Sequence, residues 1–174
     1  MKTLEDVRNL MNELDKLTGL DSSDIPIKKS RGTRALAFFR FQQSTATPVM
    51  FGITRTVLNL SDKHFEEIIK HEYAHFMATV TYKEDCGHDY RFQEMCKMIG
   101  ATQTGTRVQN DCAAEVSKIL VNIAKYKFVC QDCGKTYTYR RMSDKLRRFI
   151  RASQNGHLAC TKCHGTDLKF IQRD

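Results

Sequence analysis

The first part of the chain changes from a helical to an extended pattern of apolar residues and back again. Residues 3–19 carry apolar side chains at a spacing of three and four, with Thr3 placed to cap a helix and Gly19 to end it. Between residues 33 and 60, the runs RALAFFRF, TPVMFGIT and TVLNL are short and rich in aromatic and β-branched residues, which predicts strands of a small sheet. A second amphipathic stretch, with Ser61 as its cap, predicts a helix to about residue 79.

Two more helices are expected before the pattern changes again near residue 125. A helix from near His88 to Gly100 and another over about 110–122 are expected first. Beyond Lys125, the alternating runs KYKFVC and KTYTYRR resemble short strands beside pairs of cysteines. We therefore expect an α+β fold with two domains, residues 1–124 and 125–174.

Charge separates these two parts. Residues 125–174 contain 12 Lys or Arg against 4 Asp or Glu, so they carry the whole net charge of +8 of the 174-residue chain. Such a basic segment favours a polyanionic partner, nucleic acid before an anionic membrane. No apolar run reaches the roughly 18–20 residues of a membrane span, and the start of the chain lacks the apolar core of a signal peptide. These features predict a cytoplasmic protein without a membrane partner.

The helix expected over 61–79 contains the pattern H-E-x-x-H, formed by His71, Glu72 and His75. At this spacing the two histidines lie about 6 Å apart along a helix axis and about 40° apart around it, so both imidazoles can bind one ion. His64 lies about 10 Å earlier along the axis, too far to share that ion, and is expected at the surface.

Glu72 lies on the apolar face of this helix. On a helical wheel it falls among Phe65, Ile68 and Phe76, although the opposite face offered solvent. A buried carboxylate needs a cation or a specific polar site, and a metal-bound water supplies one. The alternative is a satisfied polar cluster or a purely structural metal.

A catalytic zinc usually has three protein ligands, so a third is expected downstream. His88 follows His75 by thirteen residues and comes after a short loop. Glu94 is its rival, and the two are about 240° apart on one helix, so they would not both face the metal. Three weaker options lie near them: Glu84, Cys86 and Asp89.

The sequence HEYAH, followed by a loop and by His88 with Phe92 four residues later, resembles the SprT-like metalloproteases, which include the Spartan proteases that act on DNA–protein crosslinks. That family commonly has glycine after the third histidine, whereas this chain has Asp89. The resemblance covers nearly the whole chain. It implies a minimal zincin-like metalloprotease domain followed by a zinc ribbon, with a catalytic zinc bound by His71, His75 and His88.

The resemblance and the chemistry imply the same mechanism. Zinc lowers the pKa of its water, Glu72 takes the proton, and the hydroxide attacks a peptide carbonyl. By analogy with other zincins, the substrate is expected to pair with an edge strand drawn from about residues 48–60. The residue that stabilises the oxyanion is not assigned by the sequence. Four candidates lie nearby: Tyr73, Tyr82, Tyr90 and Arg91.

Four of the seven cysteines form two C-x-x-C turns, Cys130 with Cys133 and Cys160 with Cys163. Four thiolates satisfy tetrahedral zinc in a closed structural site, which a small domain with a thin core needs. Redox use is the weaker interpretation, because neither turn follows a βαβ pattern. The sequence thus predicts two zinc ions per chain, one catalytic and one structural. Histidine ligands and the family resemblance favour zinc over manganese or iron at the first site.

The 26 residues between the two turns are strongly basic. Ser143 is placed to cap a short helix there, and Tyr137 and Tyr139 precede it on a strand. The tyrosines either stack on unpaired bases or pack inside the ribbon. Six side chains are the predicted nucleic-acid-binding residues: Arg140, Arg141, Lys145, Arg147, Arg148 and Arg151.

The sequence as a whole predicts a zinc-dependent endopeptidase that cleaves proteins associated with or crosslinked to DNA. Its partners are then protein substrates and nucleic acid, DNA first, and its place is the nucleoid, or the nucleus in a eukaryote. Two other interpretations stay open. One is a non-enzymatic nucleic-acid-binding zinc protein with a structural or vestigial histidine site, and the other is a metal-dependent nuclease.

Overall fold

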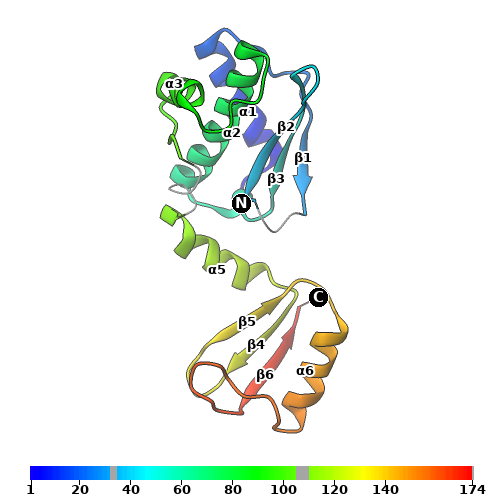
Figure 1. Ribbon diagram of the computed structural model, residues 1–174. Helices are drawn as coiled ribbons and strands as arrows, with labels where there is room; N and C mark the ends of the chain where they lie inside the picture. The colour runs from blue at the N-terminus through cyan, green and yellow to red at the C-terminus, as the bar shows by residue number, and fades with distance from the viewer. Residues whose placement is uncertain (32–34, 105–109, 174) are drawn as a thin grey trace. The chain divides into compact units, whose positions relative to one another are not determined.

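The computed structural model describes residues 1–31, 35–104 and 110–173, and Figure 1 shows their helices and strands. They group into two compact units, Met1–Val116 and Ser117–Asp174. Helix α5 (Ala113–Ile123) begins in the first unit and ends in the second. The architecture is α+β, as expected, with helices beside a small sheet in each unit. Domain limits at 1–124 and 125–174 stay a prediction.

The described part of the first unit contains three strands and, besides the start of α5, three α-helices. In chain order they are α1 (Leu4–Thr18), β1 (Ile27–Ser30), β2 (Ala37–Gln42), β3 (Thr47–Thr54), α2 (Asp62–Tyr82) and α3 (Tyr90–Ile99). The predicted strand at TVLNL is wrong, since Val57–Asn59 forms a 3-10 turn in which Val57 and Leu58 are buried. Strand β1 was not predicted because its sequence, IKKS, is short and does not alternate apolar and polar residues.

Strand β3 is the centre of the sheet, with β1 parallel on one side and β2 antiparallel on the other. The expectation that the segment 48–60 supplies an edge strand is therefore wrong, because both edges of β3 are already paired. The amide of Phe51 in β3 donates to Pro26 on the β1 side. Phe39 lies opposite Phe51, so the peptide groups of Phe39 face away from β3. Strand β2 is thus an edge strand of this sheet, and no further described strand pairs with its outer edge.

Helix α2 packs against β2 and β3. The ring of Phe76 meets Phe39 and Phe51 edge-on, at centroid distances of 6.0 and 6.2 Å. Helix α1 is joined to α2 by Tyr73, which is fully buried and donates a hydrogen bond of 2.6 Å to Asp15. Both ends of α1 are as predicted, with a capping box at Thr3 and a left-handed glycine at Gly19.

After the end of α5, the second unit forms a three-stranded antiparallel sheet with helix α6 beside it. Its elements are β4 (Tyr126–Cys130), β5 (Thr136–Tyr139), α6 (Asp144–Gln154) and β6 (Leu168–Gln172), and the strand order is β5-β4-β6. Ser143 caps α6 as predicted, by accepting the Leu146 amide. Leu146 and Phe128 form the centre of a small core that includes Cys130 and Cys160. Among the described helices, none combines the length and the hydropathy that crossing a membrane requires.

Candidate metal centres and catalytic cleft

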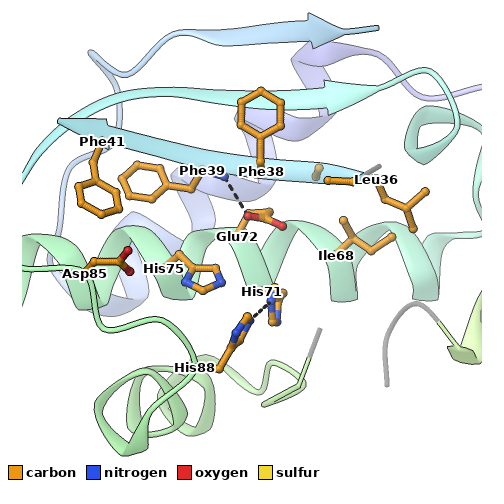
Figure 2. Close-up of a pocket in the computed structure, with 12 residues that line it drawn as sticks. Leu36, Phe38, Phe39, Phe41, Ile68, His71, Glu72, His75, Asp85 and His88 are labelled. Carbon is orange, nitrogen blue, oxygen red and sulfur yellow. Dashed lines mark hydrogen bonds between the residues drawn. The ribbon is translucent and has the colours of Figure 1, made fainter. Parts of the chain in front are cut away.

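The three predicted histidines come together in the first unit. His71 and His75 lie one turn apart on α2, and His88 lies in the loop just before α3. One ring nitrogen from each lies within 4.8 Å of the others, and the Nε2 atoms of His71 and His88 are 3.1 Å apart. Figure 2 shows the three rings grouped close together beneath Glu72. The four-residue spacing of His71 and His75 on α2 thus brings both imidazoles to one site, as helical geometry predicts.

This donor set fits zinc. With Zn–N bonds of about 2.0–2.1 Å, tetrahedral ligand atoms lie about 3.3 Å apart, close to the His71–His88 separation. Burial, with the neighbouring His71 and His88 rings, lowers the pKa of His75 to about 3, so its lone pair is available to a metal at neutral pH. Three neutral imidazoles and one open position are typical of a catalytic rather than a structural zinc site.

Two residues orient these rings without offering a ligand atom. The Nδ1 of His71 lies 3.1 Å from the carbonyl oxygen of Thr102 and donates to it, which leaves Nε2 for the metal. Phe92 is fully buried and contacts all three imidazoles, with its ring stacked on His75 at a centroid distance of 4.3 Å. No sequence pattern indicates the Thr102 contact, which joins residues 31 positions apart.

The rival third ligands are engaged elsewhere. Asp89 caps α3 by accepting the amides of Arg91 and Phe92, and both Asp89 and Glu84 pair with the Arg91 guanidinium. The glycine-to-aspartate departure from the family pattern therefore supplies a helix cap. Glu94 accepts a 3.4 Å hydrogen bond from Tyr82. Helix α3 begins two residues after His88, because Asp89 is its N-cap.

Cys86, the weak candidate ligand, and His64 both lie outside the histidine cluster. Cys86 is buried, and its thiol contacts the carbonyl oxygen of Glu84 at 3.8 Å. His64 is half-buried rather than at the surface, and its Nδ1 lies 2.6 Å from the Glu115 carboxylate. The same carboxylate accepts a hydrogen bond from the Ser61 amide. Glu115 thus binds a main-chain amide at the start of α2, where a cap by the Ser61 side chain was predicted.

Glu72 lies in a cleft of about 360 Å³ between α2 and β2 (Figure 2). The cleft is lined by the three histidines and by apolar side chains of β2 and α2. The Phe39 amide, on the outer edge of β2, donates a hydrogen bond of 2.9 Å to Glu72 Oε2. Burial raises the pKa of Glu72 to about 7, and the Phe39 hydrogen bond opposes that rise. A cation among the histidines would, like the Phe39 hydrogen bond, lower the pKa of Glu72 and so keep the carboxylate ionised.

None of the four suggested oxyanion residues lines this cleft. Tyr73 points to α1, where its hydroxyl donates to Asp15 and lies 3.0 Å from Thr18. Arg91 is held by the two acidic side chains beside it, and its guanidinium lies over the rings of Tyr82 and Tyr90. None of these four side chains is therefore placed to stabilise an oxyanion in the cleft.

The second unit brings its four paired cysteines together. The sulfur atoms of Cys130, Cys133, Cys160 and Cys163 lie within 4.8 Å of one another, with Cys130–Cys163 at 3.5 Å and Cys133–Cys160 at 3.6 Å. Tetrahedral sulfur ligands on zinc, at Zn–S bonds of about 2.3 Å, lie about 3.8 Å apart. The cluster therefore fits a closed structural zinc site at the end of the ribbon.

Tyr137 and Tyr139 pack inside the ribbon. The Tyr137 hydroxyl lies 3.2 Å from Cys160 Sγ and accepts the Thr161 amide at 2.8 Å. Its hydrogen bond is the main reason that the pKa of the Cys160 thiol is lowered to about 5. Tyr139 is half-buried and meets Phe128 edge-on. The sequence left stacking on bases and packing as alternatives, and the structure favours packing.

All six predicted nucleic-acid-binding residues are exposed. Arg140 and Arg141 follow β5, and Lys145, Arg147, Arg148 and Arg151 lie on α6. Met142 and Ile150 line a shallow depression together with Arg147 and Arg151. The role of these residues in binding nucleic acid stays a prediction.

Comparison with known proteins agrees with the site geometry. A curated relative, "Protein SprT-like" from Streptococcus equi subsp. zooepidemicus (strain H70), is 28% identical over 111 residues, which are 62% of this chain and 60% of the relative. The chain thus spans about 60% of that relative's length. A solved structure, the metallopeptidase zymogen of Pyrococcus abyssi abylysin, covers 64% of this chain and 95% of its own at 15% identity and a TM-score of 0.49. The sequence model of the SprT-like family matches residues 17–113, more than half of the chain, and the chain therefore belongs to the SprT-like family.

Proposed function

We propose that the chain is a zinc-dependent endopeptidase that cleaves proteins bound or crosslinked to DNA inside the cell. One observation carries the hydrolytic part of this proposal. The Glu72 carboxylate lies in the same cleft as the three imidazoles and is held there by the Phe39 amide. A purely structural metal site would gain nothing from this acid, whereas peptide hydrolysis requires a base beside the metal.

When bound, zinc supplies a Lewis acid that acidifies a water molecule and polarises a peptide carbonyl. Glu72 accepts the proton of the attacking water and passes it to the departing amine nitrogen. The Phe39 amide orients one carboxylate oxygen, so Oε1 is the oxygen turned to the water. The Nδ1–H of His71 donates to the Thr102 carbonyl oxygen throughout the reaction, because this ring acts as a ligand and not as an acid.

Substrate binding follows from the outer edge of β2. The peptide groups of Ala37 and Phe39 face away from β3. The Phe39 amide is already bonded to Glu72, so an extended substrate can add to β2 as a further strand through the Ala37 amide and the carbonyls of Ala37 and Phe39. We infer an antiparallel arrangement, since antiparallel pairing is the more stable of the two ladders per residue. The cleft under β2 then receives alternate side chains of the substrate.

The DNA part of the proposal rests on charge. The second unit carries all of the excess positive charge of the chain, and the six basic side chains named above are exposed. Such residues bind phosphates irrespective of base sequence, and binding brings protein substrates on the same DNA within reach. This location of the positive charge is what favours proteins on DNA over free peptides.

Four reactions test the proposal: wild type and Glu72→Gln, each with a DNA-binding protein as substrate and with or without single-stranded DNA. Glutamine keeps the Phe39 hydrogen bond but cannot take a proton, so cleavage should fall about 10²–10⁴-fold. DNA should accelerate wild-type cleavage. Degradation of the DNA instead would indicate a nuclease, and no cleavage of either polymer would indicate a binding protein.

A further inference from the structure

The cleft beside Glu72 has two ends of different chemistry. At one end Leu36 and Ile68 make an apolar lining (Figure 2). At the other end, Phe41 lies above and Asp85 below, and the Asp85 carboxylate is the one acidic group besides Glu72 among the residues that line the cleft. A substrate side chain at that second end would therefore meet aromatic rings and a negative charge together.

The position of Asp85 is fixed by its own loop. Its Oδ1 accepts the amide of Gly87 at 2.9 Å, and Gly87 has a φ of 49°, a conformation that glycine adopts readily. Among the described residues, no hydrogen bond to Oδ2 is present. The side chain is exposed, so its carboxylate is accessible to a substrate side chain that enters this end of the cleft.

The aromatic wall suits the stem of a long cationic side chain. The rings of Phe39 and Phe41 are stacked, with centroids 5.9 Å apart and planes 21° apart, and both line the cleft. Lysine and arginine bury their methylene groups along such rings and keep the charged head near water. Cations are also attracted to aromatic faces, whereas a carboxylate would be repelled by both the rings and Asp85.

The direction of β2 tells which part of the substrate reaches Asp85. Strand β2 runs from the Leu36 end of the cleft to the Phe41 end (Figure 2). A strand added in the antiparallel sense runs the opposite way, so its amino-terminal portion lies at the Asp85 end. We propose that Asp85, with Phe39 and Phe41, forms a subsite for a Lys or Arg side chain on the amino-terminal side of the cleaved bond.

This subsite rests on the proposed endopeptidase function and names its substrate class, basic unfolded segments. Proteins that bind DNA are rich in such segments, because phosphate contacts are made by lysine and arginine. The apolar Leu36 end carries no comparable requirement for charge. Selection therefore acts on one side of the bond only.

Binding to the full chain with Glu72→Gln tests the subsite without requiring catalysis. The protein is loaded with zinc, and the probes are fluorescent peptides of one parent sequence. Lysine, norleucine or glutamate is placed at each peptide position in turn. Lysine should bind about fivefold more tightly than norleucine at one amino-terminal position, the gain of a partly exposed ion pair. The additional change Asp85→Asn should abolish this difference, since asparagine keeps the Gly87 hydrogen bond but not the charge. Asp85→Lys should favour glutamate.

Glu84→Gln is the matched control, because it removes the same charge one residue away and outside the lining of the cleft. It should leave the lysine preference intact. An equal preference in Asp85→Asn, a preference located on the carboxyl side of the bond, or loss of zinc from Asp85→Asn would each overturn the subsite. Parallel cleavage assays with active enzyme keep the two proposals apart: peptides that bind with the predicted preference but are never cut would refute the endopeptidase and retain the subsite.

Discussion

Phe92 has a large part in the histidine site although it offers no ligand atom. Its buried ring touches the imidazoles of His71, His75 and His88 and limits the directions in which they can turn. Three rings held in this way lose little further freedom when a metal binds, which favours affinity.

Phe92→Ala should therefore weaken zinc binding as well as stability. A buried phenylalanine replaced by alanine costs about 3–5 kcal/mol, and loss of an orienting contact typically lowers metal affinity about 10–100-fold. Zinc competition titrations and urea unfolding measure the two effects. Phe65→Ala, at a buried position of α2 away from the ligands, is the control that should cost stability but leave zinc affinity near that of wild type.

In the ribbon, the Tyr137 hydroxyl has a similar orienting role at the sulfur site. Tyr137→Phe removes the hydrogen bond to Cys160 and leaves the Thr161 amide without its acceptor. We expect the ribbon to lose zinc to a chelator about tenfold more readily. Tyr139→Phe should release zinc at the wild-type rate, and equal release by both variants would show that the Tyr137 contact is unimportant.

At the residue scale, the sequence predicted the metal-binding and catalytic side chains better than the groups that hold them in position. The spacing of His71 and His75 is a local helical property, and the family resemblance pointed to His88. The supports are main-chain groups, the carbonyl of Thr102 and the amide of Phe39, which any residue type can provide. No pattern of side chains identifies them.

Among the elements, strand β2 determines how a substrate can lie. Its outer edge faces the cleft, and one of its amides already holds Glu72. Sequence patterns gave β2 and β3 as strands but placed the edge in the wrong one. Strand order depends on pairing between distant segments, including the unpredicted β1, and local periodicity does not record it.

A proline scan through a good peptide substrate should give an alternating response. Proline lacks an amide hydrogen, and successive residues of an extended strand direct their amides to opposite sides. Positions that pair with β2 should lose at least about tenfold in kcat/KM, whereas the positions between them should tolerate proline better. A scan without this period of two would argue against pairing with β2.

Helices α1 and α2 depend on a buried polar connection. Tyr73→Phe removes the hydroxyl that bonds Asp15 and Thr18, and should lower the free energy of unfolding by about 1–3 kcal/mol. Urea denaturation followed by circular dichroism measures this loss. Tyr82→Phe is the comparison, since it keeps the ring beneath Arg91 and removes only a hydroxyl with a long hydrogen bond to Glu94, and it should change stability by less than about 0.5 kcal/mol.

For the whole molecule, the two units each have their own core and their own cluster of potential ligands. The division into a neutral segment and a basic segment was visible in the sequence, because charge and cysteine spacing are properties of composition. The arrangement of charge in three dimensions was not, since it depends on which face of α6 packs on Leu146.

Metal analysis of the intact chain should find two zinc ions. Cys130→Ser should lose one ion and unfold the second unit, whose small core includes two of the thiolates, while the first unit remains folded around its larger core. Limited proteolysis, which would then remove only the carboxyl-terminal fifty residues or so, provides the check. A single ion in the wild-type chain would mean that one of the two clusters does not bind zinc.

The two clusters also differ in their vulnerability. Thiolate sulfur atoms bind soft metals such as cadmium strongly and are easily oxidised. Imidazole nitrogens bind soft metals less strongly and are less easily oxidised. Cadmium or peroxide would therefore damage the cysteine site before the histidine site. Under the function proposed above, such damage would separate proteolysis from DNA binding, so oxidative or heavy-metal stress would relax the selectivity of cleavage before it stopped the reaction.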